Sequence, residues 1–119
     1  MKTKKELKNE YKLMKFRMGV FQIRNTVNNK IFIESSTDLD SIWNRHRFQL
    51  NFGNHPNDAL QKDWKALGEN QFIYEILNIY EPSETVITNH IKELKLLEQM
   101  FIDELQPFDE KGYHNWRKL

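Results

Sequence analysis

One carboxylate, Glu98, lies on what the sequence otherwise marks as the buried face of a helix. Residues 84–105 have helical composition, and at about 100° per residue their apolar side chains fall within one arc that also contains Glu98: Ile87, Ile91, Leu94, Leu97, Phe101 and Leu105. An ionised carboxylate on a buried face is costly unless it is paired or binds a cation. Glu98 is therefore a candidate metal ligand. The simpler interpretation is a salt bridge, or a side chain that reaches solvent from the edge of the apolar arc.

A basic segment at the N-terminus is the second feature that could bind phosphate. Residues 1–17 carry seven basic and two acidic side chains, a net charge of +5, whereas the whole chain has +1 and the other 102 residues therefore sum to −4. Clustered lysine and arginine bind nucleic acid through counterion release, without sequence preference. The candidate residues are Lys4, Lys5, Lys8, Lys12, Lys15 and Arg17. The alternative is a solvated, lysine-rich helix.

Composition excludes several classes of protein. The chain of 119 residues has the size of one domain. It has no cysteine, so a metal ion would have to be held by His, Asp, Glu or carbonyl oxygens. It has four glycines and no glycine-rich phosphate loop, which excludes dinucleotide-binding folds. No apolar run approaches the roughly 18 residues of a membrane span, so no membrane partner and a cytoplasmic location are expected.

Hydrophobic periodicity predicts an α+β domain. Residues 20–24 and 31–33 are apolar and rich in β-branched residues, and the Asn-rich segment between them predicts a β-hairpin. A helix capped by Thr37 or Asp38 is expected to end near Gly53, and a second is expected from Pro56 and Asn57 to Gly68. A third strand at 71–79 and a helix at 84–105 are expected to follow, and the pattern of residues 4–16 predicts a further helix at the N-terminus. Trp43 and Trp64 are expected to pack between helices and sheet.

An ordered series of short motifs resembles the GIY-YIG nuclease domain over residues 18–115. The matching segments are Gly19-Val20-Phe21, Phe32-Ile33-Glu34, Trp43-Asn44-Arg45-His46, Gly68, Phe72, Glu98-Gln99-Met100-Phe101-Ile102 and Gly112-Tyr113-His114-Asn115. The resemblance implies a small three-stranded antiparallel sheet flanked by helices over 18–119, to which 1–17 adds a basic helical arm. It also implies DNA as a partner and Mg²⁺ or Mn²⁺ as a cofactor.

The resemblance implies an active site in which one catalytic position matches the family and three do not. In active members of the family, tyrosine hydroxyls engage the attacking water, an arginine stabilises the phosphate and a glutamate holds the metal ion. The glutamate position is Glu98, but the tyrosine positions are Phe21 and Phe32 and the arginine position is Ile42. None of these three side chains can donate a hydrogen bond. Glu34 stands where the second motif has glycine.

Two residues could partly replace the missing groups. Arg45 and His46 follow Ile42 by three and four positions, so they are expected to point toward the same cleft, where His46 could serve as a general base. The alternative is that His46, which like His55 resembles a histidine of the family, has a structural role while Arg45 is solvated. Glu34 could add a second metal ligand beside Glu98, repel the substrate phosphate, or remain a surface carboxylate.

The sequence thus predicts a GIY-YIG-like domain with a degraded catalytic site, acting as a non-catalytic nucleic-acid-associated or regulatory module. A divergent metal-dependent endonuclease that uses Glu98, Arg45 and His46 is the principal alternative. A module that binds small molecules or proteins is the third. The sequence does not specify an oligomeric state.

Overall fold

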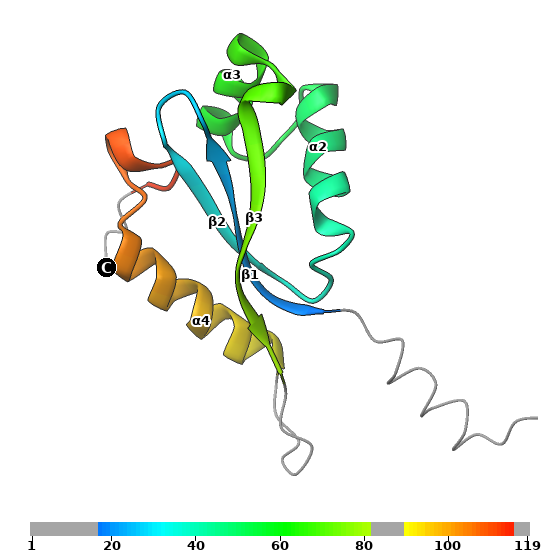
Figure 1. Cartoon of the computed structure of the whole chain (residues 1–119), viewed down its shortest axis with the longest axis vertical. Helices are drawn as coiled ribbons and strands as arrows, with labels where there is room; N and C mark the ends of the chain where they lie inside the picture. The colour runs from blue at the N-terminus through cyan, green and yellow to red at the C-terminus, as the bar shows by residue number, and fades with distance from the viewer. Residues whose placement is uncertain (1–16, 82–89, 116–119) are drawn as a thin grey trace, which may run out of the picture.

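The computed structural model describes residues 17–81 and 90–115, which form a three-stranded antiparallel sheet with helices on both faces (Figure 1). The strand order is β2-β1-β3, so β1 is central. The strands are β1 (Met18–Asn25), β2 (Ile31–Ser36) and β3 (Phe72–Tyr80); the helices are α2 (Ile42–Phe52), α3 (Asp58–Leu67) and α4 (His90–Leu105), with short 3-10 helices η1 (Glu69–Gln71) and η2 (Asp109–Lys111). The predicted α+β class and three-stranded sheet are confirmed.

Part of the predicted architecture lies outside the described residues. This applies to the helix predicted over 4–16 and to the first residues of the helix predicted from 84. The division into a basic arm and a domain beginning at residue 18 remains a prediction. Among the helices that the structure describes, none combines the length and the apolarity needed to cross a membrane.

The predicted hairpin is present and is fastened to the C-terminal part of the chain. Across its turn, the Asn25 N–H donates to the Lys30 carbonyl at 2.9 Å. The Asn25 side chain is fully buried, and its Nδ2 donates to the Tyr113 hydroxyl at 3.0 Å. The Tyr113 N–H in turn donates to the Ile31 carbonyl at 3.0 Å. The Gly-Tyr element near the C-terminus therefore holds the hairpin at two points.

Strand β3 approaches β1 very closely at Gly19. A Cβ atom at this position would lie 1.9 Å from the Asn78 carbonyl oxygen, a main-chain atom that no side-chain adjustment can move aside. The register of the two strands shifts between Val20 and Phe21, just after this contact. The glycine of the first motif is thus required by the packing of the sheet.

Helix α2 begins later than the sequence predicts. Its first residue is Ile42, whereas a cap at Thr37 or Asp38 would start the helix at residue 38 or 39. The Asp38 carboxylate accepts hydrogen bonds from the Ser41 N–H at 3.2 Å and from the Ser41 hydroxyl at 2.5 Å, and these close a turn ahead of the helix. The predicted end is confirmed, because Gly53 caps the helix with φ +86°.

Helix α3 has both of its predicted ends. The Asn57 side chain accepts a hydrogen bond from the Leu60 N–H at 3.0 Å, as an N-cap does. At the other end Gly68 adopts φ +90° and its N–H donates to the Trp64 carbonyl. Helices α2 and α3 contact each other, and Leu60 and Trp64 of α3 pack with Phe72 of the sheet.

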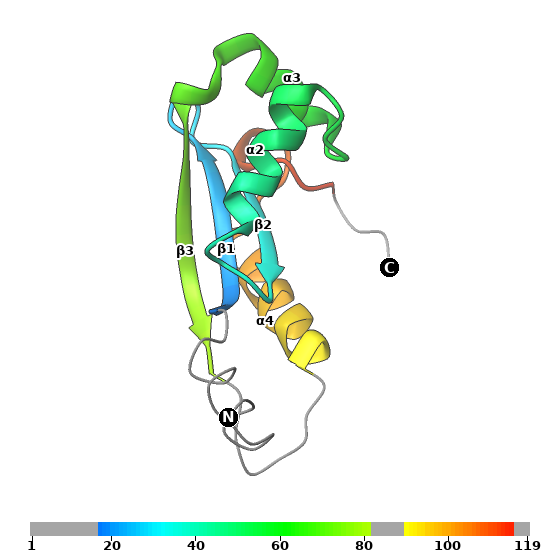
Figure 2. The same ribbon diagram turned by 90° about the vertical axis from the view of Figure 1, so that its right-hand side faces the viewer.

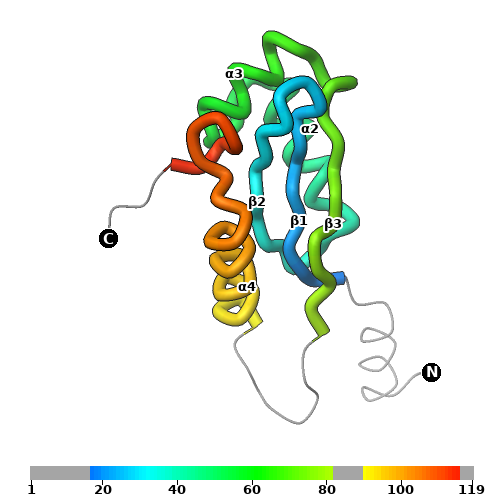
Figure 3. Tube along the Cα trace, turned by 60° about the vertical axis from the view of Figure 1, so that its left-hand side comes forward, coloured from blue at the N-terminus to red at the C-terminus, as the bar shows by residue number. Residues whose placement is uncertain are grey.

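Helices α2 and α4 cover opposite faces of the sheet (Figure 2), and α4 runs alongside the edge strand β2 (Figure 3). The core on the side of α2 and α3 consists of Phe21, Ile23, Leu39, Leu50, Leu60, Trp64, Phe72 and Tyr113. A smaller cluster of Val20, Ile33 and Ile102 lies on the side of α4. Trp64 is buried and Trp43 packs against the larger cluster, so the predicted packing role of these tryptophans is confirmed.

Candidate active site

The three family positions that have lost their polar groups lie together between the sheet and α2. Phe21 is completely buried, and Phe32 and Ile42 pack against the same core cluster. The rings of Phe21 and Phe32 each have their centroid 5.6 Å from that of His46. These side chains form an apolar wall. It offers no hydroxyl and no guanidinium at the positions where the family resemblance implies them.

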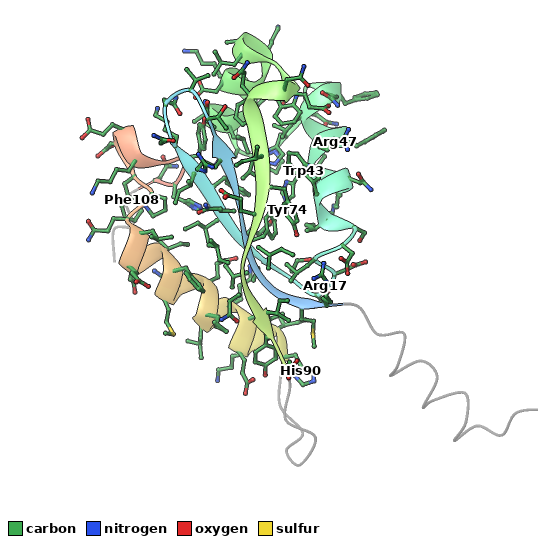
Figure 4. All side chains as sticks on the ribbon, in the orientation of Figure 1. Arg17, Trp43, Arg47, Tyr74, His90 and Phe108 are labelled. Atoms are coloured by element: carbon green, nitrogen blue, oxygen red, sulfur yellow. The ribbon has the colours of Figure 1, made fainter. Side chains whose placement is uncertain are left out.

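Tyr74 is a nearby tyrosine that could compensate for the missing hydroxyls, and its geometry argues against that role. Its ring centroid lies 5.1 Å from that of Phe21 and 5.7 Å from that of Trp43, between β3 and α2 (Figure 4). Its hydroxyl donates to the Leu39 main-chain carbonyl at 2.5 Å. Burial, with the nearby Asp40 carboxylate, raises the pKa of Tyr74 to about 12. Tyr74 is therefore a structural tyrosine.

A chain of hydrogen-bonded side chains lies next to this apolar wall. The Oε2 atom of Glu34 lies 2.5 Å from Nε2 of His46, and Nδ1 of His46 lies 2.8 Å from Nε2 of His55. The Asn57 N–H donates to Nδ1 of His55 at 3.0 Å. Both histidines are buried, whereas the Glu34 side chain is about one-third exposed. The chain thus runs from the interior to a carboxylate at the surface.

The hydrogen bonds determine where the protons lie. Because the Asn57 N–H occupies Nδ1 of His55, the proton of neutral His55 is on Nε2 and donates to Nδ1 of His46. His46 then carries its proton on Nε2 and donates it to Glu34. Burial, reinforced by the neighbouring His46, lowers the pKa of His55 to about 4, which agrees with a neutral ring.

This arrangement leaves His46 unavailable as a general base. Both ring nitrogens are already engaged, one with Glu34 and the other with His55. Arg45, which was expected to point toward the same cleft, is exposed on α2, whereas His46 is buried. The engaged ring of His46 fits the alternative interpretation, in which His46 has a structural role and Arg45 is solvated.

Glu98 lies on the opposite face of the sheet from the hydrogen-bonded chain of Glu34, His46 and His55. Its Oε1 atom accepts hydrogen bonds from the N–H of Ser35 at 2.7 Å and from the Ser35 hydroxyl at 3.1 Å, and Nζ of Lys95 is 3.7 Å away. Its side chain is 18% exposed. Glu34 and Ser35 are consecutive on β2, so their side chains point to opposite faces, one toward α2 and one toward α4. Glu34 contacts His46 and not Glu98.

The donor groups present fit a resident divalent metal ion poorly. Glu98 offers one carboxylate, whose Oε1 is already held by Ser35 and lies near the Lys95 ammonium. In the part of the chain that the structure describes, no three His, Cys, Asp or Glu side chains are grouped closely enough to hold a metal ion. Magnesium could bind one carboxylate only with waters and substrate phosphate completing its shell. The described side chains therefore do not form a complete binding site for a divalent ion.

The candidate phosphate-binding residues are mostly outside the described part of the chain. Lys4, Lys5, Lys8, Lys12 and Lys15 all belong to residues that are not described. Arg17 is described, and its guanidinium forms an exposed ion pair with Asp40, at the beginning of β1 (Figure 4). This ion pair holds the pKa of Asp40 below its usual value. Any phosphate that Arg17 bound would have to compete with the Asp40 carboxylate.

The hydrogen-bonded chain of Glu34, His46 and His55 is the feature that sequence reasoning did not find as a unit. The residues were noted singly, Glu34 as an unexpected acid and the histidines as family-like. The signal that could have joined them is the hairpin register, which pairs Glu34 with Phe21 and so places both side chains on the face that α2 covers. No comparable signal gave the position of His55, which depends on the loop between α2 and α3.

Comparisons with known proteins agree with the fold and the motif series. No family model matches the chain. The intron-associated endonuclease 1 of Enterobacteria phage T4 is 38% identical over 50 residues, which are 42% of this chain and 20% of that protein. The chain therefore spans about one-fifth of the length of this curated relative.

Solved structures give a more extensive match. The catalytic domain of the homing endonuclease I-TevI is 30% identical, with a TM-score of 0.68, and the match covers 85% of this chain and 99% of that one. A mutant of the same catalytic domain gives a TM-score of 0.69 at 30% identity over 83% of this chain and 93% of that one. Because the likeness covers practically the whole of that catalytic domain in both fold and sequence, the chain belongs to the GIY-YIG nuclease superfamily.

Proposed function

We propose that this domain is a non-catalytic member of its superfamily that associates with nucleic acid. The observation that carries the proposal is one apolar cluster, in which Phe21 is fully buried and Phe32 and Ile42 are partly buried, at the positions where the family resemblance implies two tyrosines and an arginine. Phosphodiester hydrolysis needs an activated water and a cation for the charge that develops on phosphate. Phe21, Phe32 and Ile42 can supply neither.

The expected loss of rate is large. Removing one group that stabilises the transition-state charge typically lowers the rate on the order of a hundred- to a thousandfold. Loss of the hydroxyls that engage water adds to this deficit. Glu34 works in the same direction, because its partly exposed carboxylate repels a phosphate.

Binding to nucleic acid is supported by two observations. Both relatives whose names were given above are endonucleases by name. The segment 1–17 has a net charge of +5, which suits phosphate contacts that depend on charge and not on base sequence. Binding without cleavage is the function that combines these features with the apolar cluster.

Salt-dependent binding tests the first half of the proposal. A fluorescein-labelled 20-base-pair duplex is titrated with the full chain, and with a chain that begins at residue 17, over a series of salt concentrations. The affinity of the full chain is expected to fall steeply with salt, and the truncated chain is expected to bind more weakly with a smaller salt slope. Negligible binding that is independent of salt would reject the proposal in favour of a protein-binding or small-molecule-binding module.

A divergent metal-dependent endonuclease is the second candidate, and the retention of Glu98 favours it. Its carboxylate occupies the family position and is held in place by Ser35. If a substrate phosphate and waters completed a magnesium shell at Glu98, Arg45 would be the exposed cation on α2. Plasmid nicking with Mg²⁺ or Mn²⁺ that disappears in Glu98→Ala would establish this function and reject ours.

A further inference from the structure

Helix α2 carries an aromatic pair on its solvent side. Phe48 and Phe52 are 69% and 72% exposed, and their rings stack with centroids 5.6 Å apart and planes 22° apart. Both positions are opposite His46 and Leu50, the buried residues of the same helix. Large apolar side chains that cluster at the surface in this way commonly mark a binding site.

The surroundings of the pair are cationic. Arg45 is exposed and precedes Phe48 by three residues, so it lies on the same side of the helix. Helix α2 contains no aspartate or glutamate. The nearest carboxylate in the neighbouring groove, Glu69, is paired with Arg47 at 2.9 Å. A negatively charged partner is therefore attracted to this surface and is not repelled from it.

A groove continues from Phe52 toward α3. It has a volume of about 610 Å³, and its lining includes Phe52, Trp64 and the exposed Lys65. Its polar walls are internally satisfied: Asn51 accepts from Nε1 of Trp64 at 2.9 Å, and Gln61 donates to the Leu50 carbonyl at 2.9 Å. The groove thus presents an aromatic face and a cation, with few hydrogen-bonding groups left for reading a base.

We propose that this surface, formed by Phe48, Phe52, Arg45 and Lys65, binds unpaired nucleotides of single-stranded nucleic acid. The inference rests on the proposed function and specifies the class of ligand. A base stacks on the exposed face of a phenylalanine, and the backbone phosphates lie toward the arginine and the lysine. Duplex DNA cannot bind in this way, because its base faces are covered by the neighbouring base pairs. The satisfied groove walls imply tolerance of base sequence.

A second copy of the chain fits this surface less well. A stable dimer buries about 800 Å² on each partner, mostly apolar at its centre. Two phenylalanines offer roughly 150–250 Å² each before any part is covered, and the charged Arg45 and polar Asn44 adjoin them on the helix. The surface around the aromatic pair is thus too small and too polar to form the apolar centre of a dimer interface. Stacking, in contrast, needs only one ring face for each base.

The test compares single-stranded and double-stranded probes on the full-length chain. Fluorescein-labelled dT12 and a 12-base-pair duplex are titrated with the wild type and with the double variant Phe48→Ala/Phe52→Ala. The matched control is Leu96→Ala/Met100→Ala, which removes an exposed apolar pair of the same spacing from α4. All the replaced side chains are at least 60% exposed, so the variants are expected to fold, as circular dichroism checks.

The phenylalanine variant is expected to lose affinity for dT12 by roughly 5- to 150-fold for each base that stacks, while the duplex affinity and the control are unchanged. Lys65→Gln is expected to reduce the salt slope for dT12 by about 0.7. If the phenylalanine variant binds dT12 as tightly as the wild type does, the inference is overturned while the proposed function stays intact. The inference would also be overturned if sedimentation showed that the wild type is a dimer and that the phenylalanine variant is a monomer with unchanged affinity for dT12. Absence of binding to both probes by the wild type would overturn both proposals.

Discussion

Acidification should destabilise this domain through His55. The ring is 4% exposed, and burial with the neighbouring His46 lowers its pKa from 6.5 to about 4. In the unfolded chain His55 takes up a proton as the pH falls below 6.5, whereas in the folded chain it does so only near pH 4. The unfolded state therefore binds more protons between these values, and the free energy of unfolding rises with pH across this window.

The size of the effect follows from the difference between the two pKa values. One pKa unit corresponds to about 1.4 kcal/mol, so the contribution of His55 is complete above pH 6.5 and falls by about 3 kcal/mol on reaching pH 4. Protonation would also place a positive charge on a ring whose Nδ1 already accepts a hydrogen bond from Asn57. For a domain of this size the urea midpoint should fall by roughly 1 to 3 M.

Urea unfolding followed by tryptophan fluorescence measures this contribution at a series of pH values. The comparison is with His55→Gln, which is expected to be less stable at pH 7.5 because hydrogen bonds are lost, but to show a flatter pH dependence between 6.5 and 4. Taking the difference between the two proteins removes the contributions of the other titrating groups, among them Asp40 and Glu75, whose pKa values are also lowered. Equal pH dependence of both proteins would refute the reasoning.

Two further predictions concern residues that fix the framework of the site. Asn57→Ala removes the N-cap of α3 and should lower the free energy of unfolding by about 1–2 kcal/mol. Asn57→Ser should lose less, because the serine hydroxyl can still accept from the Leu60 N–H. Chemical denaturation measures both variants. Gly19→Ala places a Cβ 1.9 Å from the Asn78 carbonyl and should cost about 1–3 kcal/mol or more in the same measurement, whereas a cost below 0.5 kcal/mol would show that β3 moves aside freely.

The fold followed from sequence patterns that depend on few distant contacts. Alternating apolar residues gave the strands, and Asn57, Gly53 and Gly68 gave ends of helices that the structure confirms. The predicted beginning of α2 was too early, because the residues after Asp38 form a turn, closed by the Ser41 N–H donating to the Asp38 carboxylate, and the helix begins only at Ile42. Hydrophobic type alone does not fix burial, as the exposed rings on α2 demonstrate.

The site was less accessible to sequence reasoning. Periodicity placed Glu98 on the apolar face of its helix, where Leu94 is buried, but Ile91 and Leu105 of the same predicted arc are 63% and 39% exposed, so the prediction of a continuous buried face is wrong. The partner of Glu98 is a main-chain N–H at Ser35, which no side-chain pattern reveals. The chain of Glu34, His46 and His55 joins a strand, a helix and a loop. Such contacts depend on the relative placement of elements, which the periodicity within each element does not determine.

Cleavage of supercoiled plasmid DNA tests most directly whether the catalytic chemistry has been lost. The full chain, in molar excess over plasmid, is incubated with Mg²⁺ and separately with Mn²⁺, beside Glu98→Ala prepared in the same way. We expect binding without nicking above the level of the Glu98→Ala protein, because the side chains of Phe21, Phe32 and Ile42 can neither activate water nor stabilise the phosphate. Metal-dependent nicking that Glu98→Ala abolishes would contradict that loss.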